Sequence, residues 1–372
     1  MSAFWLSRYA RKSGYSKCTA PLFSAHFPGS DFMRVIVLTL SLLCTTGLVS
    51  AADWFPVEVQ ADGRTQLYQP LPKAAKPWRI CALLPHGKDR YWWGVAWGLD
   101  EEAARQGVRL GIYEAGGYEN PQVQAQQLEQ CRQLDADAYI IAAINAQALC
   151  GAIATLVEQG KPVVELVNGN DCPGLSANSN VDFADMLRAA LGYIEQHRPA
   201  GPYSLGWLPG PQGAGWVEDL ERALREAQQT GRMRVEHAGY APVDRASQAQ
   251  LVRELFRQHP HLDYLLGNAE AAGFAAQLVQ TSGQNYRAQV LATYTTERII
   301  EQIRDGFIVA APTDSPVLQA RIAVDLAVRV LEDQPHARQV SPMIQMASLP
   351  QFDISRLMPP PEHWMIRRDL PQ

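Results

Sequence analysis

The chain has 372 residues, of which 47% are hydrophobic and 19% are charged, and its formal net charge is −5. This length allows two domains of ordinary size, each with its own core. A nucleic-acid-binding protein needs a basic surface that neutralises phosphates, and the acidic balance of charge argues against such a surface. We therefore expect two domains and no nucleic-acid partner.

An apolar run near the N-terminus has the pattern of an export signal. Met33 and Arg34 precede an apolar run from Val35 to Val49, and the small residues Ser50 and Ala51 follow it. A charged start, a short apolar core and small residues at the cleavage point predict a signal peptide over residues 33–51, and hence a periplasmic protein with no membrane insertion after cleavage. Residues 1–32 show no helical or strand period, and we expect them to be a non-native upstream extension. The alternative is a genuine N-terminal segment followed by a membrane anchor, for which the run is short.

Four cysteines follow the expected cleavage point, at Cys81, Cys131, Cys150 and Cys172. An even number in an exported chain is consistent with two disulfides, but more than one pairing is possible and the sequence does not separate them. We favour Cys81–Cys131 and Cys150–Cys172, with buried free thiols as the alternative. No cysteine and histidine spacing suggests a metal site.

The rest of the chain alternates between short apolar runs and segments with helical periodicity. Strands are predicted at 79–85, 108–113, 138–144, 162–167, 203–208, 234–240, 262–267, 289–294 and 307–311. Helices are predicted at 92–106, 121–134, 146–159, 184–196, 216–229, 247–258, 269–281, 296–305 and 316–331. Near-continuous apolar strands that alternate with helices indicate parallel sheets covered on both faces. The predicted fold class is α/β, with two doubly wound parallel-sheet lobes joined by crossover hinge strands.

The order of these elements predicts where each lobe begins and ends. We expect residues 52–77 to form an N-terminal arm that Trp54, Phe55 and Tyr68 pack in place, rather than a core element. The predicted lobes are 78–183 plus 296–332 for lobe 1, and 184–295 plus 333–372 for lobe 2.

Aromatic residues are concentrated at the predicted strand ends, where open parallel sheets bind ligands. They are Tyr91, Trp92, Trp93, Tyr118, Trp216 and Tyr294. Ring faces attract a quaternary or polarised nitrogen by about 0.5–2 kcal/mol each, and they also stack on sugars. The alternative interpretation is that one or two of these residues pack at helix starts. For Trp93 and Trp216 this account is as good as ligand binding.

Signals for catalysis are weak. The glycine-rich stretch Gly210 to Gly215 has neither the lysine of a phosphate-binding loop nor the dinucleotide-binding spacing, and no Gly-x-Ser-x-Gly elbow occurs. Of the histidines, we expect only His86 to face the cleft. We therefore predict a binding protein with no enzymatic activity, no metal and no cofactor.

Several motifs are shared with a known family. They are Cys81-Ala82-Leu83, Lys88-Asp89 followed by Tyr91-Trp92, Glu114-Ala115-Gly116-Gly117-Tyr118, Cys131, Val164-Glu165-Leu166-Val167-Asn168 and Pro209-Gly210-Pro211. With these motifs the chain resembles the TorT family from about Trp78 to about Ala347. Members of that family are periplasmic proteins that bind trimethylamine N-oxide and present it to the sensor domain of a TorS-type membrane histidine kinase. Sugar-binding relatives share the fold but not the pair of motifs Tyr91-Trp92 and Glu114-Ala115-Gly116-Gly117-Tyr118.

The resemblance implies a type I periplasmic binding protein fold and a set of ligand residues. By that resemblance the ligand-binding positions are Asp89, Tyr91, Trp92, Tyr118 and Tyr294. Where the family has a tryptophan after the fourth strand, this chain has Val181-Asp182-Phe183, so Phe183 joins the expected set. The alternative function is that of an ABC-transporter substrate-binding protein for a sugar or another small solute. A repressor of this fold is disfavoured by the signal peptide and by the lack of a helix-turn-helix before Trp78.

Overall fold

A computed structural model describes residues 54–169, 172–283, 285–350, 359–361, 363–366 and 370. The expected upstream extension and signal peptide lie outside these residues. Within the described ranges, no helix is both long enough and apolar enough to cross a membrane. The account below concerns the compact unit that starts at Ala52.

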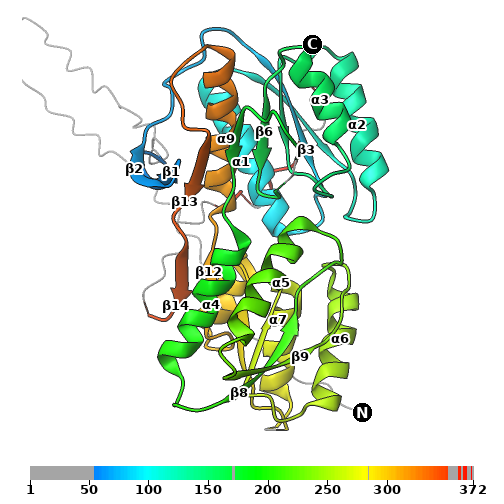
Figure 1. The fold of residues 1–372 in the computed structure, drawn as a ribbon, viewed down its shortest axis with the longest axis vertical. Coiled ribbons are helices and arrows are strands. Elements are labelled where there is room, and N and C mark those ends of the chain that lie inside the picture. The colour runs from blue at the N-terminus through cyan, green and yellow to red at the C-terminus, as the bar shows by residue number, and fades with distance from the viewer. Residues whose placement is uncertain are drawn as a thin grey trace, which may run out of the picture. The chain divides into compact units, whose positions relative to one another are not determined.

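The first sheet contains strands from both ends of this unit (Figure 1). Its strand order is β2-β1-β13-β7-β6-β5-β3-β4, and neighbours run parallel from β4 to β13. At the other edge, β1 is antiparallel to β13 and β2 is antiparallel to β1. The strands are β1 (Val57–Ala61), β2 (Arg64–Tyr68), β3 (Arg79–Leu84), β4 (Arg109–Glu114), β5 (Ala138–Ile141), β6 (Val163–Leu166), β7 (Ala177–Ser179) and β13 (Gln339–Pro342).

Helices cover both faces of the first sheet. They are α1 (Arg90–Gln106), α2 (Pro121–Gln133), α3 (Cys150–Glu158) and α9 (Pro316–Leu331). The chain moves to the sheet edge from β3 to β4 and then in the other direction to β5 and β6, so right-handed crossovers place α1 on the face opposite α2 and α3. Helix α9 packs against α1, where Gly98 leaves room for the backbone of Val317. Disulfides join Cys81 to Cys131 and Cys150 to Cys172, the pairing that we favoured.

The second sheet has the strand order β14-β12-β11-β10-β8-β9 and is parallel except for the edge strand β14. Its strands are β8 (Tyr203–Leu208), β9 (Met233–His237), β10 (Tyr264–Gly267), β11 (Gln289–Ala292), β12 (Ala310–Thr313) and β14 (Gln345–Ser348). Its helices are α4 (Phe183–His197), α5 (Gly215–Gln228), α6 (Arg245–Gln258), α7 (Ala269–Thr281) and α8 (Glu297–Arg304). Helix α4 packs on α5, and α6 packs on α7. Two helix-covered, mainly parallel sheets confirm the predicted fold class.

The lobe boundaries differ from our expectation in residues 296–332. We placed this whole segment in lobe 1, but α8 packs on α7 and β12 pairs with β11 and β14 in the second sheet. Only α9 returns to the first sheet, because the chain crosses after Thr313. The strand and helix that we treated as one unit therefore belong to different lobes.

Two further segments differ from the predicted division. Residues 333–372 do not all belong to lobe 2, because β13 pairs with β7 and β1 of the first sheet. The N-terminal arm is more than an arm, because β1 and β2 extend the first sheet. Trp54 and Tyr68 are buried as expected: the Trp54 indole donates to Glu102 at 2.9 Å, and the Tyr68 hydroxyl donates to Asp325 at 2.6 Å.

Candidate ligand-binding site between the two sheets

The six predicted site residues line one small cavity of about 30 Å³. They are Asp89, Tyr91, Trp92, Tyr118, Phe183 and Tyr294. The structure brings them together from segments that follow β3, β4, β7 and β11, as expected for the carboxyl ends of parallel strands. Five residues outside the predicted set also line the cavity: His86, Val167, Asn168, Trp216 and Val243.

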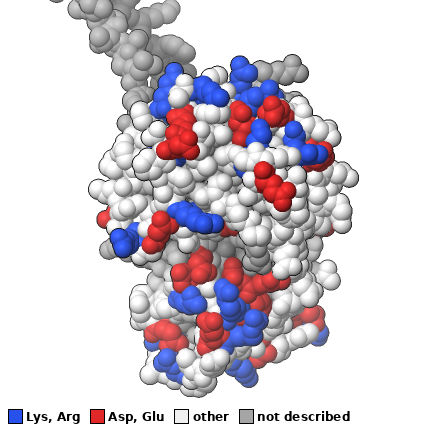
Figure 2. Space-filling view, turned by 45° about the horizontal axis from the view of Figure 1, so that its top comes forward, with Lys and Arg blue, Asp and Glu red and all other residues white. Residues whose placement is uncertain are grey.

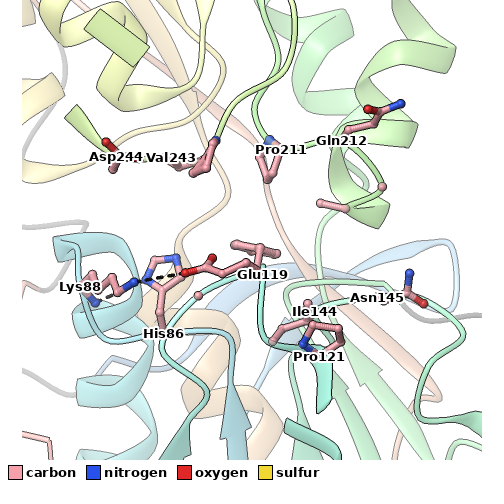
Figure 3. Close-up of a pocket in the computed structure, with 15 residues that line it drawn as sticks. His86, Lys88, Glu119, Pro121, Ile144, Asn145, Pro211, Gln212, Val243 and Asp244 are labelled. Carbon is pink, nitrogen blue, oxygen red and sulfur yellow. Dashed lines mark hydrogen bonds and ion pairs between the residues drawn. The ribbon is translucent and has the colours of Figure 1, made fainter. Parts of the chain in front are cut away.

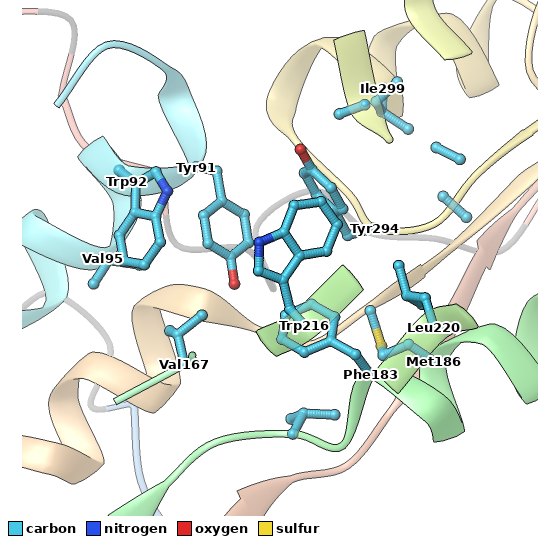
Figure 4. Close-up of a cluster of buried hydrophobic side chains, with 14 of the residues drawn as sticks. Tyr91, Trp92, Val95, Val167, Phe183, Met186, Trp216, Leu220, Tyr294 and Ile299 are labelled. Carbon is cyan, nitrogen blue, oxygen red and sulfur yellow. The ribbon is translucent and has the colours of Figure 1, made fainter. Parts of the chain in front are cut away.

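Aromatic rings from both lobes face one another around this cavity (Figure 4). Tyr91 lies between Trp92 and Tyr294, with ring centroids 5.5 and 5.3 Å away and edge-to-face geometry. Trp216 is 5.9 Å from Phe183 and 6.3 Å from Tyr294. These separations are typical of favourable aromatic pairs, so the rings form a continuous wall that we call the aromatic cage.

Asp89 fixes the first-lobe side of the cage. It is the N-cap of α1, and its carboxylate accepts the Trp92 backbone N–H at 2.9 Å. This cap starts the helix where Tyr91 and Trp92 turn inward. Burial raises the pKa of Asp89 from its usual 3.8 to about 6, against the stabilising backbone hydrogen bonds of Trp92 and Tyr91. A carboxylate with a raised pKa therefore lies beside the rings.

His86 closes another side of the cage as a neutral imidazole. Burial lowers its pKa from 6.5 to about 4; Lys88 lowers it further, and Glu114 and Glu119 oppose the change. Its ring lies 6.0 Å from that of Trp92 and 5.7 Å from that of Tyr118. The expectation that His86 faces the cleft agrees with this position.

Two hydroxyl groups of the cage, those of Tyr91 and Tyr118, have specific hydrogen-bond partners. The Tyr91 hydroxyl donates to Asp314, which is fully buried at the crossover into α9. The Asn168 amide donates to the Tyr118 oxygen at 3.1 Å and to the Ala143 carbonyl at 2.8 Å. Burial raises the pKa of both tyrosines, and nearby Asp314 and Asp89 add to the respective shifts. The tyrosines are therefore neutral and do not serve as bases.

Backbone strain occurs where the cage meets strand β6. Val167 follows β6 and has a φ of 59°, in the left-handed region that β-branched residues rarely adopt. The next residue is Asn168, which holds Tyr118. Strained residues of this kind are concentrated at binding sites, where the surrounding structure maintains them.

Trp216 is the main cage residue that the sequence did not identify with certainty. It follows the glycine-rich loop after β8, and packing at the start of α5 was an equally good account of it. The structure shows that this side chain is only 5% exposed and lies across the cavity from Trp92, with its ring nitrogen turned toward Tyr91 (Figure 4). In the sequence, only its position in the segment after a predicted strand indicated that Trp216 lies at the binding site.

A wider cleft of about 450 Å³ adjoins the aromatic cage. Loops of the first lobe around Lys88, Glu119 and Asn145 face loops of the second lobe around Gln212 and Asp244 across it (Figure 3). The side chains shared by this cleft and the cage are His86, Tyr118 and Val243. These side chains therefore separate the cage from the wider cleft.

The surface charge and the buried groups limit the chemistry of this site. On the face shown in Figure 2, acidic and basic side chains are interspersed without a continuous basic patch. Among the described residues, no group of three or more His, Cys, Asp or Glu is placed to hold a metal ion. The arrangement is suited to enclosing a small ligand among ring faces.

Two parallel sheets with a ligand-sized cavity between their strand ends define a two-lobed binding protein. Residues 80–335 match the periplasmic binding protein domain family. The periplasmic protein TorT of Escherichia coli K12 is 30% identical over 316 residues, which are 84% of this chain and 90% of the relative. The chain therefore belongs to the periplasmic binding protein family and, within it, to the TorT family.

Two solved structures have the same fold and sequence identities of 28% or more to this chain. An ABC transporter solute-binding protein from Bradyrhizobium sp. BTAi1 with bound bis-tris is 36% identical, with a TM-score of 0.74 over 86% of this chain and all (100%) of that one. TorT in a ligand-free complex with the TorS sensor domain is 28% identical, with a TM-score of 0.71 over 78% of this chain and 99% of that one. The chain is thus similar both to a signalling receptor and to a transport receptor.

Proposed function

We propose that this protein is a periplasmic receptor that binds trimethylamine N-oxide, or a closely related small methylated amine, in the aromatic cage. The observation that carries the proposal is the enclosure of a cavity of about 30 Å³ by aromatic rings of both lobes. Ring faces attract a methylated, positively polarised nitrogen at about 0.5–2 kcal/mol per ring. Asp89 adds a nearby negative charge when it is ionised.

The lining of the cage argues against a sugar. The hydroxyl groups of a sugar would need many directional hydrogen-bond partners. Most of the lining side chains are aromatic, and the Tyr91 hydroxyl is already bonded to Asp314. A compact ligand with methyl groups fits this lining better.

We further propose that the ligand-bound protein is presented to the sensor domain of a membrane histidine kinase of the TorS type. Support comes from TorT proteins: the E. coli relative carries that name, and a TorT has been solved in complex with the TorS sensor domain, both without ligand and in the presence of trimethylamine N-oxide. In this role the protein performs no reaction; the bound, closed shape is the signal.

A transport role is the second candidate, and one observation favours it. The Bradyrhizobium relative is described as an ABC transporter solute-binding protein, and its bound bis-tris is a hydroxylated tertiary amine. The two roles differ in the membrane partner, which is a kinase for signalling and a permease for transport.

Two measurements on the chain that starts at Ala52 test the proposal. A thermal-shift series with trimethylamine N-oxide, tetramethylammonium and D-ribose should show stabilisation by the methylated compounds, because a ligand that binds only the folded state raises its stability. Size-exclusion chromatography with a TorS-type sensor domain should show a complex. Stabilisation by ribose alone, with no complex, would reject the signalling proposal in favour of sugar transport.

A further inference from the structure

Trp216 carries a buried hydrogen-bond donor that has no acceptor. Its indole Nε1 is inaccessible to solvent and makes no hydrogen bond. A buried N–H without a partner destabilises the folded protein, so its presence calls for an explanation, such as a partner that arrives with a ligand. Because Trp216 lines the aromatic cage, a bound ligand is the natural partner.

The glycine before the loop turn fixes the orientation of this indole. Gly210 has a φ of +135°, and a Cβ atom there would lie 2.5 Å from the Cη2 atom of Trp216. The ring therefore packs directly on the Gly210 backbone, and Phe183 lies on another side at 5.9 Å between centroids. With the ring held in this way, its N–H keeps one direction relative to the cavity.

Other polar groups of the cage indicate where this donor is directed. The pKa of Tyr118 is raised chiefly by burial, and the side chains of Asn168, Trp216 and Trp92 oppose that rise. Trp216 and Trp92 oppose it as hydrogen-bond donors, so both indole N–H groups, one from each lobe, lie near the Tyr118 oxygen. For Trp216 this contact falls short of hydrogen-bond geometry, and its N–H is left for a ligand oxygen. The Tyr91 proton is already used by Asp314.

We infer that Trp216 Nε1 is a specificity-determining donor that binds an oxygen carried by the methylated amine. This inference rests on the proposed function and adds the group of the protein that recognises the acceptor oxygen attached to the methylated nitrogen. The rings of Tyr91, Trp92 and Tyr118 hold the methyl groups from the first lobe, and Trp216 holds the oxygen from the second. The ligand thereby connects the two lobes.

The experiment is calorimetric titration of trimethylamine N-oxide and of tetramethylammonium, which has the methyl groups but no oxygen. Trp216→Phe keeps a ring in place and removes the N–H. We expect it to weaken N-oxide binding about tenfold or more, the usual cost of removing one partner of a hydrogen bond to a charged group. Tetramethylammonium binding should change far less. Trp78→Phe is the matched control, because Trp78 lies outside the cavity and its indole N–H donates to Glu332 at 2.8 Å; it should change neither affinity.

The outcomes separate this inference from the proposed function. Equal weakening for both compounds, or unchanged N-oxide binding in Trp216→Phe, overturns the role of the N–H and leaves the proposed function standing. Wild-type protein that binds neither compound overturns both.

A second measurement applies even if the variant does not fold. In the ¹⁵N-indole spectrum of the wild type, the Trp216 N–H signal should shift downfield with the N-oxide and much less with tetramethylammonium. Identical responses to the two compounds would contradict the inference.

Discussion

Replacement of Asp89 by asparagine should change how the stability of the protein depends on pH. Asparagine is also a good N-cap, so α1 keeps its first-turn hydrogen bond while the cage loses a titrating carboxyl group. The pKa of Asp89 in the folded protein is raised by burial from 3.8 to about 6. Between these values the folded protein binds more protons than the unfolded chain, so this group lowers stability as pH rises and its full cost is present above about pH 6.

The same pH range contains an effect of opposite sign from His86. Its folded pKa is lowered by burial from 6.5 to about 4, so here the unfolded chain binds more protons. This group therefore makes stability rise with pH from about 4 to 6.5. Each shift is a little over two pKa units, which corresponds to at most about 3 kcal/mol per group. In the wild type the two contributions largely cancel.

Urea unfolding of the wild type and of Asp89→Asn from pH 4 to pH 7 measures the difference. Relative to the wild type, the variant should gain stability as pH rises, by up to about 3 kcal/mol, because only the His86 contribution remains at this site. His86→Gln should show the reverse trend relative to the wild type. A constant difference between Asp89→Asn and the wild type across this range would show that the carboxyl group titrates normally, and would refute the account of Asp89 as a desolvated, half-buried cage residue.

Three further predictions test the cage, its support and the disulfides. Trp92→Ala should weaken binding of trimethylamine N-oxide by about tenfold to a hundredfold in calorimetry, because a ring face is lost. An equal loss in Trp78→Ala, which lies outside the cavity, would contradict this. Trp364→Ala should weaken binding about threefold, because its ring packs 6.1 Å from that of Trp93. The Trp93 indole in turn donates to the Gly87 carbonyl at 2.7 Å, in the loop that carries Asp89. An unchanged affinity would show that the C-terminal contact does not support the site. Loss of the Cys81–Cys131 disulfide should lower the free energy of unfolding in urea by about 4 kcal/mol, and loss of Cys150–Cys172 by about 3 kcal/mol. The reason is that these bridges restrict the unfolded chain by closing loops between residues 50 and 22 positions apart. Native protein with four reactive thiols would contradict both.

Most of the fold could be predicted because its strands are buried and apolar. Strands such as β5 and β6 are fully buried, so they appear in the sequence as short hydrophobic runs between helices. Strand β7 was missed because Ala177–Ser179 is short and polar. The position of β12 was wrong because sheet membership depends on pairing with β11 and β14, which the periodicity of residues 310–313 does not encode.

The candidate site could be predicted in part because aromatic residues stand at strand ends, where a core does not require them. The family resemblance added Asp89 and, through a substitution, Phe183. The contribution of Trp216 could not be decided, because a tryptophan at a helix start is also a common packing residue. Its unpaired Nε1 and its contact with Gly210 follow from the packing of two distant segments, and no local sequence pattern reports them.

The most direct test of the central claim is a crystal structure of the protein grown with trimethylamine N-oxide. We predict density for the ligand inside the aromatic cage, with its nitrogen among the rings of Tyr91, Trp92 and Tyr118 and its oxygen at hydrogen-bonding distance from Trp216 Nε1. An empty cage in crystals that contain the compound, or a cage occupied only by a sugar, would contradict the claim that this protein is a receptor for methylated amines.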